Sequence, residues 1–171
     1  READQFRAET RELTDAVERD ALTGIGNRRA LDRALGALLS QGAARCTLAL
    51  VDCDHFKAVN DRASHLAGDR VLQRIAKVLT QASRKSDLAA RFGGDEFAVV
   101  FADAGGEEAA NVCERIRAAV EHHGDDGAPA VTVSIGVAAA APGDTVEALI
   151  GRADAALYRA KAEGRNRVAA Q

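Results

Sequence analysis

The sequence predicts an α+β domain in which helices pack on a sheet that contains at least one antiparallel strand pair. Short apolar runs suited to buried strands alternate along the chain with segments whose apolar residues recur every three or four positions, as in amphipathic helices. A Gly93-Gly94 turn that leads into an apolar run indicates a hairpin, and therefore an antiparallel pair. With 171 residues, 47% of them apolar, the chain suits one domain with a sizeable core.

The N-terminal residues 1–19 predict an amphipathic linker helix. The residues with the three-four spacing of an a/d seam are Ala3, Phe6, Thr10, Leu13 and Val17. This length leaves two alternatives open, a short coiled coil or a single helix that lies on its own domain. The chain contains no methionine, so we expect it to be a segment of a longer protein.

The remaining elements are predicted in chain order from the period of the apolar residues. Helices are expected around residues 31–38, 71–79 and 109–120, and a last helix from about 144 to 164. Continuous apolar runs predict buried strands at 48–51, 97–101 and 131–137, and residues that break regular structure predict a loop at 124–129.

Composition excludes several classes of function. A net charge of −3 gives no sign of broad nucleic-acid binding. No stretch approaches the ~20 apolar residues of a membrane span, and no signal peptide is visible. Cys46, Cys53 and Cys113 show no paired metal spacing and leave an odd thiol, which favours buried thiols in a reducing compartment. We expect a cytoplasmic location without membrane contact by this segment, either alone or as the cytoplasmic part of a membrane-anchored protein.

Two acidic clusters are candidate metal ligands. Asp95 and Glu96 follow the double-glycine turn and offer the hard oxygens that Mg²⁺ prefers, although an ordinary solvated turn would read the same way. Asp52 and Asp54 follow the buried strand and project from the same side of its end. Buried carboxylates require compensation by a cation or by donors, whereas exposed loop acids do not. The presence of both clusters in one chain favours the metal site.

Five segments in family order resemble the GGDEF family of diguanylate cyclases. They are residues 20–29, 52–69, the signature Gly93–Phe97, 131–137 and 153–168. The resemblance implies a catalytic domain over residues 20–171, built on a mostly antiparallel five-stranded sheet with a ferredoxin-like, palm-type core similar to that of class III nucleotide cyclases. It also implies that a homodimer condenses two GTP molecules into cyclic di-GMP and two pyrophosphates. An upstream sensor domain and inhibition by the product are further expectations.

The resemblance assigns the metal site and the phosphate site. Asp52 and Asp95 are the expected ligands of Mg²⁺ or Mn²⁺, with the carbonyl of Cys53 as a further oxygen. Glu96 is either a second metal ligand or the group that helps to deprotonate the attacking 3′-hydroxyl. The expected phosphate contacts are Lys161 and Arg165, supported by Lys57 and the backbone near His55 and Phe56. Lys161 and Arg165 are placed near the end of the last helix, where the helix dipole alone would also favour cations.

Base selection is assigned to Asn60 and Asp69. The carboxylate of Asp69 can accept from the N1 and N2 hydrogens of guanine, whereas adenine offers an acceptor at N1. A turn cap at Asn60 and a helix start at Asp69 are the plain alternatives. His65 also matches the family, in a structural role. Ser64 replaces a usual glycine, so we expect a changed backbone and altered affinity at the guanine pocket.

A product-binding site is expected just before the signature. Arg84 and Asp87 are three residues apart and match the family's inhibitory site, with Arg91 and Arg115 completing it. The same pair could be an exposed salt bridge. Three functions therefore remain open, in this order: an active cyclase, a receptor for cyclic di-GMP, and a GTP-binding or dimerisation module.

Overall fold

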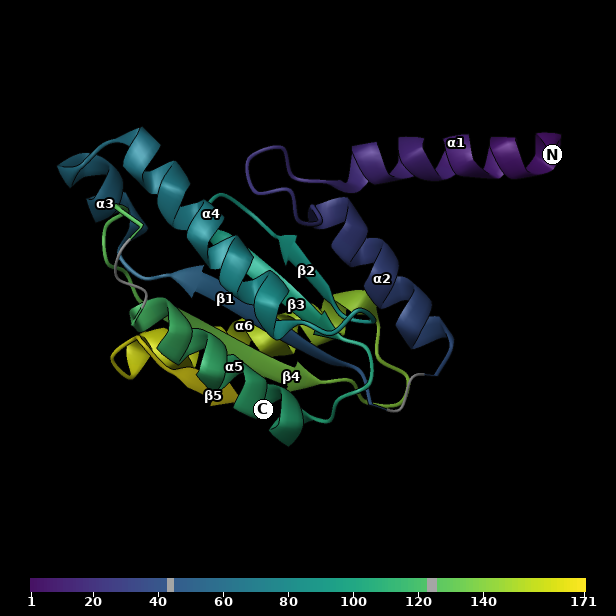
Figure 1. Ribbon diagram of the computed structural model, residues 1–171. Helices are drawn as coiled ribbons and strands as arrows, with labels where there is room; N and C mark the ends of the chain where they lie inside the picture. The colour runs from purple at the N-terminus through teal and green to yellow at the C-terminus, as the bar shows by residue number, and fades with distance from the viewer. Residues whose placement is uncertain (43–44, 123–125) are drawn as a thin grey trace.

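The computed structural model describes residues 1–42, 45–122 and 126–171. In this part of the chain the helices and strands follow in the order α1 (Glu2–Glu18), α2 (Arg28–Ser40), β1 (Thr47–Cys53), α3 (Phe56–Arg62), α4 (His65–Ala82), β2 (Leu88–Arg91), β3 (Glu96–Phe101), α5 (Gly106–Glu121), β4 (Val133–Ala139), α6 (Val146–Ala162) and β5 (Val168–Ala170) (Figure 1).

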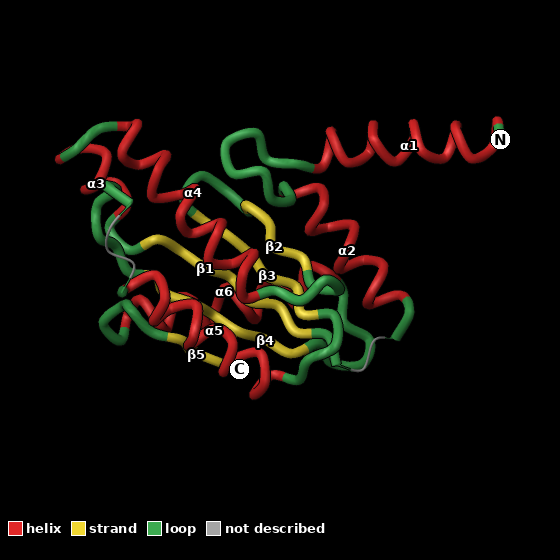
Figure 2. The backbone as a smooth tube through the Cα atoms, in the orientation of Figure 1, coloured by secondary structure: helices red, strands yellow, loops and turns green. Residues whose placement is uncertain are grey.

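The strands form one five-stranded sheet in the order β2-β3-β1-β4-β5 (Figure 2). The central strand β1 is antiparallel to β3 and β4, β2 is antiparallel to β3, and β5 is parallel to β4. From β1 to β4 the chain runs strand, helices, two strands, helix, strand, which is the ferredoxin-like arrangement. The predicted α+β class and mostly antiparallel sheet are confirmed.

Helices cover both faces of this sheet, and the alternation of side chains along β1 divides the core in two. Ala49 and Val51 pack with residues of α4 and α5, whereas Leu48 and Leu50 pack with α2 and α6. Successive strand residues face opposite sides. Asp52 therefore continues the face that α6 covers.

A close approach of α6 to β4 brings this helix over the end of β1. A side chain at Gly136 would overlap the backbone of α6 at Ala153 and Leu157. Only glycine leaves room for the helix to lie this close to the strand. The positions of the side chains on α6 thus depend on the glycine at position 136.

The sequence predicted most elements but not all. The helices around 31–38, 71–79 and 109–120 correspond to α2, α4 and α5, and the last helix is α6. The short helix α3 was not predicted. The loop expected at 124–129 falls partly on residues 124 and 125, which lie outside the described residues. All three cysteines are buried free thiols, as expected.

Helix α1 extends away from the body of the molecule (Figures 1 and 2). Its seam residues Phe6, Leu13 and Val17 are 71%, 69% and 52% exposed. The alternative of a helix lying on its own domain is therefore wrong, because along most of its length the apolar face is exposed and contacts no other element in the described part of the chain. Among the described residues no helix combines the length and apolarity that a membrane crossing requires.

Candidate active site

Three charged side chains meet at the end of the central strand. Asp52 and Glu96 are direct partners in the register of β1 and β3, so their side chains share the face that α6 covers. From α6, the Lys161 ammonium forms an ion pair with Oδ2 of Asp52. Asp52 is buried, with only 8% of its surface exposed. Two acids and one cation predicted from distant segments are thus brought together.

The environment of Asp52 disfavours its charge. Burial raises the pKa of its carboxyl group to about 6, and the nearby Asp95 and Glu96 add to this effect against the opposing ion pair with Lys161. Burial acts to lower the pKa of Lys161, but Asp52, Glu96 and Asp95 outweigh it and raise this pKa. The site holds more negative charge than its own cation neutralises, which suits it to a further cation.

The backbone of the signature turn is held by hydrogen bonds from both sides. The Cys53 amide donates to the carbonyl of Asp95 at 3.2 Å, and the amides of Phe92 and Gly93 donate to the carbonyl of Glu96 at 2.8 and 3.2 Å. A Cβ at Gly93 would lie 3.2 Å from Oε2 of Glu96. The first signature glycine therefore leaves the space that the Glu96 carboxylate uses.

Arg91 holds the same turn from β2. Its guanidinium donates to the carbonyl of Gly94 at 3.0 and 2.7 Å and pairs with Asp20 at 3.3 Å. These contacts use its donors within the domain. A contact between Arg91 and a product molecule, which the resemblance predicts, would share this guanidinium with the bonds that hold the signature turn.

The donor set fits a divalent cation in part. Oδ1 of Asp52 is buried and has no hydrogen-bond partner in the described part of the chain. Burial raises the pKa of the Cys53 thiol to about 12, so this residue could offer only its carbonyl oxygen. Within the described ranges no three His, Cys, Asp or Glu side chains gather closely enough to hold an ion alone. Because Mg²⁺ commonly combines one or two carboxylates with substrate phosphates, the set is complete only with a nucleotide.

Arg165 lies just beyond the end of the last helix, near which it was predicted. Helix α6 ends at Ala162, and the amides of Gly164 and Arg165 close it by donating to the carbonyls of Lys161 and Ala160. Arg165 itself has a left-handed backbone, with φ 62°. Its exposed side chain leaves the chain just beyond Lys161, so the two cations remain close in sequence but are held by different structures.

The other predicted phosphate contacts lie just before α3 and in its first turn. His55 has a left-handed backbone, with φ 56°, and is exposed. Lys57 is exposed on α3, whereas Phe56 packs partly against the core as expected of an apolar ring.

The two residues predicted to select guanine belong to helices that touch. Oδ1 of Asn60 on α3 lies where a side chain at Gly68 on α4 would be, and Asp69 follows directly. This Oδ1 is buried and finds no hydrogen-bond donor among the described residues, so it is a candidate partner for a base.

The backbone at Ser64 differs from the expectation. Its φ of −179° is an extended conformation that any residue adopts, and its hydroxyl caps α4 by accepting from the amide of Ala67. No strain arises from the missing glycine. His65 follows as the exposed first residue of α4.

The predicted product site is an exposed turn after α4. The Asp87 carboxylate accepts from the amides of Arg84 and Ala102, at 2.8 and 3.2 Å. The Arg84 guanidinium pairs with Glu108 in the first turn of α5, at 3.1 Å. Arg115, two turns further along α5, lies on the same side of that helix and is exposed.

Sequence reasoning missed the role of Asp54. Both of its carboxylate oxygens are used: Ser134 donates to Oδ1 at 2.7 Å, and Thr132 and the Asn166 amide donate to Oδ2 at 2.7 and 3.0 Å. Donors therefore compensate Asp54, whereas Oδ1 of Asp52 has no hydrogen-bond partner among the residues that the structure describes. A Gly-x-Asn sequence after a helix, typical of left-handed backbone, could have drawn attention to Asn166.

Comparison with known proteins decides the family. The model described as "Diguanylate cyclase, GGDEF domain" matches residues 17–167. The chain belongs to this family. This GGDEF domain is 39% identical over 155 residues to the diguanylate cyclase VdcA of Vibrio cholerae, covering 87% of this chain and 45% of VdcA. It is 42% identical over 159 residues to the response regulator PleD of Caulobacter vibrioides, covering 87% of this chain and 35% of PleD. The GGDEF domain thus spans less than half the length of these relatives.

Two solved structures match nearly the whole chain. The coiled coil and GGDEF domain of DgcB from Caulobacter crescentus, in complex with c-di-GMP, has a TM-score of 0.89 and 34% identity, with 99% of this chain and 94% of that chain covered. The diguanylate cyclase SiaD from Pseudomonas aeruginosa, in complex with its activator SiaC, has a TM-score of 0.85 and 35% identity, with 99% and 69% covered. The first of these matches includes the region of α1.

Proposed function

We propose that this GGDEF domain joins two GTP molecules into cyclic di-GMP and releases two pyrophosphates. The observation that carries the proposal is the cluster of Asp52, Glu96 and Lys161 beside the intact signature turn. At the end of the central strand it combines two carboxylates, one of them with an oxygen that has no partner among the described residues, and a cation. Phosphoryl transfer needs both, because negative charge on the phosphates must be neutralised while a hydroxyl attacks.

Each residue has a role that follows from its charge and position. Lys161 and Arg165 would bind the triphosphate and stabilise the charge that develops on the leaving pyrophosphate. Glu96 would accept the proton of the 3′-hydroxyl or hold a metal ion. Asn60 and Asp69 would pair with the donor edge of guanine.

Asp52, Asp95, Glu96 and the Cys53 carbonyl would hold Mg²⁺ or Mn²⁺ together with phosphate oxygens. When bound, such an ion neutralises phosphate charge and makes a coordinated hydroxyl more acidic. The unpartnered Oδ1 of Asp52 and the raised pKa of this group support its assignment as a ligand.

The reaction joins two nucleotides, so we propose that the domain acts as a homodimer with one GTP in each half. The free apolar seam of α1 supports this arrangement. The greater length of the relatives VdcA and PleD supports a further domain in the full protein. We propose that this domain lies upstream and controls dimerisation. The exposed Arg84 and Arg115 and the half-buried Asp87 would bind the product and inhibit the enzyme, a role supported by neighbours solved with c-di-GMP.

The test is mass spectrometric detection of cyclic di-GMP after incubation with GTP and Mg²⁺ at several protein concentrations. We expect product that rises more than linearly with protein. Glu96→Gln should abolish it, whereas Glu147→Gln, an exposed acid in the first turn of α6, should not.

A second candidate function is reception of cyclic di-GMP at Arg84 and Asp87. It is favoured if the domain binds the product but forms none at any concentration, even when a dimerising helix is fused to α1. If it binds GTP without turnover, a binding or dimerisation module is the remaining function.

A further inference from the structure

We propose that Asn166, together with Arg117 and Glu121 on α5, positions Arg165 for the triphosphate. Asn166 has not been assigned a role in the site so far, and α5 contributes no residue to it. The inference rests on the proposed function, because it concerns the cation expected to bind the leaving pyrophosphate.

The segment between α6 and β5 needs external support. Both Arg165 and Asn166 have left-handed backbones, with φ 62° and 46°. This conformation is unfavourable for a residue with a Cβ, particularly for arginine, and persists only where surrounding contacts fix it. The closing bonds of α6 reach only as far as the amide of Arg165.

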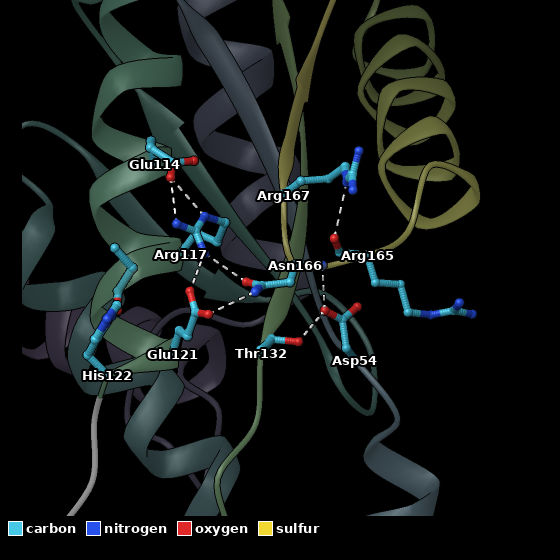
Figure 3. Close-up of polar contacts among 10 residues, drawn as sticks. Asp54, Glu114, Arg117, Glu121, His122, Thr132, Arg165, Asn166 and Arg167 are labelled. Atoms are coloured by element: carbon cyan, nitrogen blue, oxygen red, sulfur yellow. Dashed lines mark hydrogen bonds and ion pairs between the residues drawn. The ribbon is translucent and has the colours of Figure 1, made fainter.

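Asn166 is fixed on two sides, as Figure 3 shows. Its backbone amide donates to Oδ2 of Asp54 at 3.0 Å. Asp54 lies two residues after Asp52. Its side-chain oxygen accepts from Arg117 at 2.8 Å, and its side-chain nitrogen donates to Glu121 at 3.1 Å. Asn166 therefore joins the end of β1 to the last turns of α5.

Arg117 is itself held in place. Its side chain is 16% exposed and donates to Glu114 at 2.9 and 2.6 Å and to Glu121 at 2.5 Å. Because Glu114 and Glu121 both bind the Arg117 guanidinium, its orientation is fixed. The hydrogen bond from Arg117 then fixes the side chain of Asn166.

The consequence lies in the direction of Arg165. Its side chain points away from this network, while its carbonyl accepts from Arg167 at 3.2 Å (Figure 3). The guanidinium of Arg165 thus takes no part in the network. The contacts of Asn166 and Arg167 fix the backbone of Arg165. A preorganised arginine binds phosphate more tightly than one that must first be ordered.

The experiment compares variants in two backgrounds. Asn166→Gly still allows a left-handed backbone but removes the side-chain hydrogen bonds to Arg117 and Glu121. Arg117→Gln removes the guanidinium that binds Asn166. Each is made alone and together with Arg165→Ala. Affinity is measured by calorimetry for 3′-deoxy-GTP with Mg²⁺, since this nucleotide lacks the attacking hydroxyl. Hydrogen exchange of residues 164–167 is measured in the absence of nucleotide.

We expect each single variant to weaken 3′-deoxy-GTP binding by about tenfold and to speed exchange in residues 164–167. In the Arg165→Ala background the same changes should weaken binding by less than about twofold, because the residue through which they act is gone. Arg152→Gln is the matched control. Arg152 makes a comparable pairing with Asp144 and the Ala139 carbonyl near the other end of α6, so its loss should lower the melting temperature without changing nucleotide affinity.

Equal losses in both backgrounds, or unchanged affinity in folded single variants, would overturn the positioning role while leaving the proposed function intact. A wild-type domain that binds no 3′-deoxy-GTP would overturn both.

Discussion

Asp52 is the residue at which stability and the proposed activity oppose each other. Its burial and the acids around it raise its pKa to about 6, above the ordinary value of 3.8. Between these values the folded domain binds a proton that the unfolded chain has lost. The ionisation of Asp52 therefore lowers stability as the pH rises from about 4 to 6, and the full penalty is present above 6.

Replacing Asp52 by asparagine should remove this penalty. We expect Asp52→Asn to be more stable than the wild type at pH 7.5, by about 2 kcal/mol, and equal to it at pH 4. Thermal unfolding at both pH values measures the difference. The variant should also form no cyclic di-GMP. A constant difference at both pH values would show that Asp52 does not titrate in this range.

The contact between Gly68 and Asn60 leads to a prediction about the affinity for GTP. Alanine at this position would overlap Oδ1 of Asn60, a movable side-chain end, so Asn60 should turn away while the helix remains. We expect Gly68→Ala to weaken GTP binding by about tenfold with little loss of stability. Gly151→Ala is the control, because a Cβ there meets no atom within 4 Å. Unchanged GTP affinity in Gly68→Ala would remove Asn60 from the base site.

Single residues of the candidate site were predictable where the chemistry is local. Asp95 and Glu96 stand beside two glycines, and Asp52 follows an apolar run, so both clusters were identified from sequence. The pairing of Asp52 with Glu96 was not, because it depends on the register of β1 and β3. Among the described residues Asp54 is fully hydrogen-bonded and Asp52 is not, because donors from β4 and from the segment after α6 reach only Asp54. No local sequence pattern reveals these donors.

Among the elements, α6 and β4 form the contact on which the site depends most. Gly136→Ala would place a methyl group against the backbone of α6, which cannot turn aside as a side chain can. We expect a loss of about 2–3 kcal/mol in the free energy of unfolding, together with reduced activity as Lys161 shifts. Chemical denaturation measures the loss. Gly151→Ala, within the same helix, should instead add about 0.5–1 kcal/mol. Equal stabilities of the two variants would contradict the close packing.

Elements with several turns were predicted well, and short ones were not. Helices α2, α4 and α5 show repeated apolar spacing, whereas α3 has only seven residues and too few apolar positions to define a period. The end of α6 was predicted within two residues from Gly164, whose φ is +123°. The left-handed backbone of Arg165 and Asn166 beyond this end was not predicted, because it depends on contacts with distant segments.

At the scale of the whole molecule, α1 is the exposed feature that a dimer would cover. Replacing Phe6 and Leu13 by glutamate should leave the melting temperature unchanged, since both side chains lie outside the core. We expect the rate of cyclic di-GMP formation at low protein concentration to fall at least severalfold, and to recover partly at high concentration. Initial rates over a concentration series measure this. A rate unaffected at every concentration would show that α1 does not bring the two halves together.

The position of β1 has a consequence for synthesis of the protein. This strand lies at the middle of the sheet but is the first of the sheet's five strands to leave the ribosome, and Asn166 follows Asp54 by 112 residues. A nascent chain that has reached Val146 contains four of the five strands and both acidic clusters, yet lacks Lys161 and Arg165. Growing chains should therefore be unable to sequester GTP, and nucleotide can stabilise the fold only after translation has passed α6.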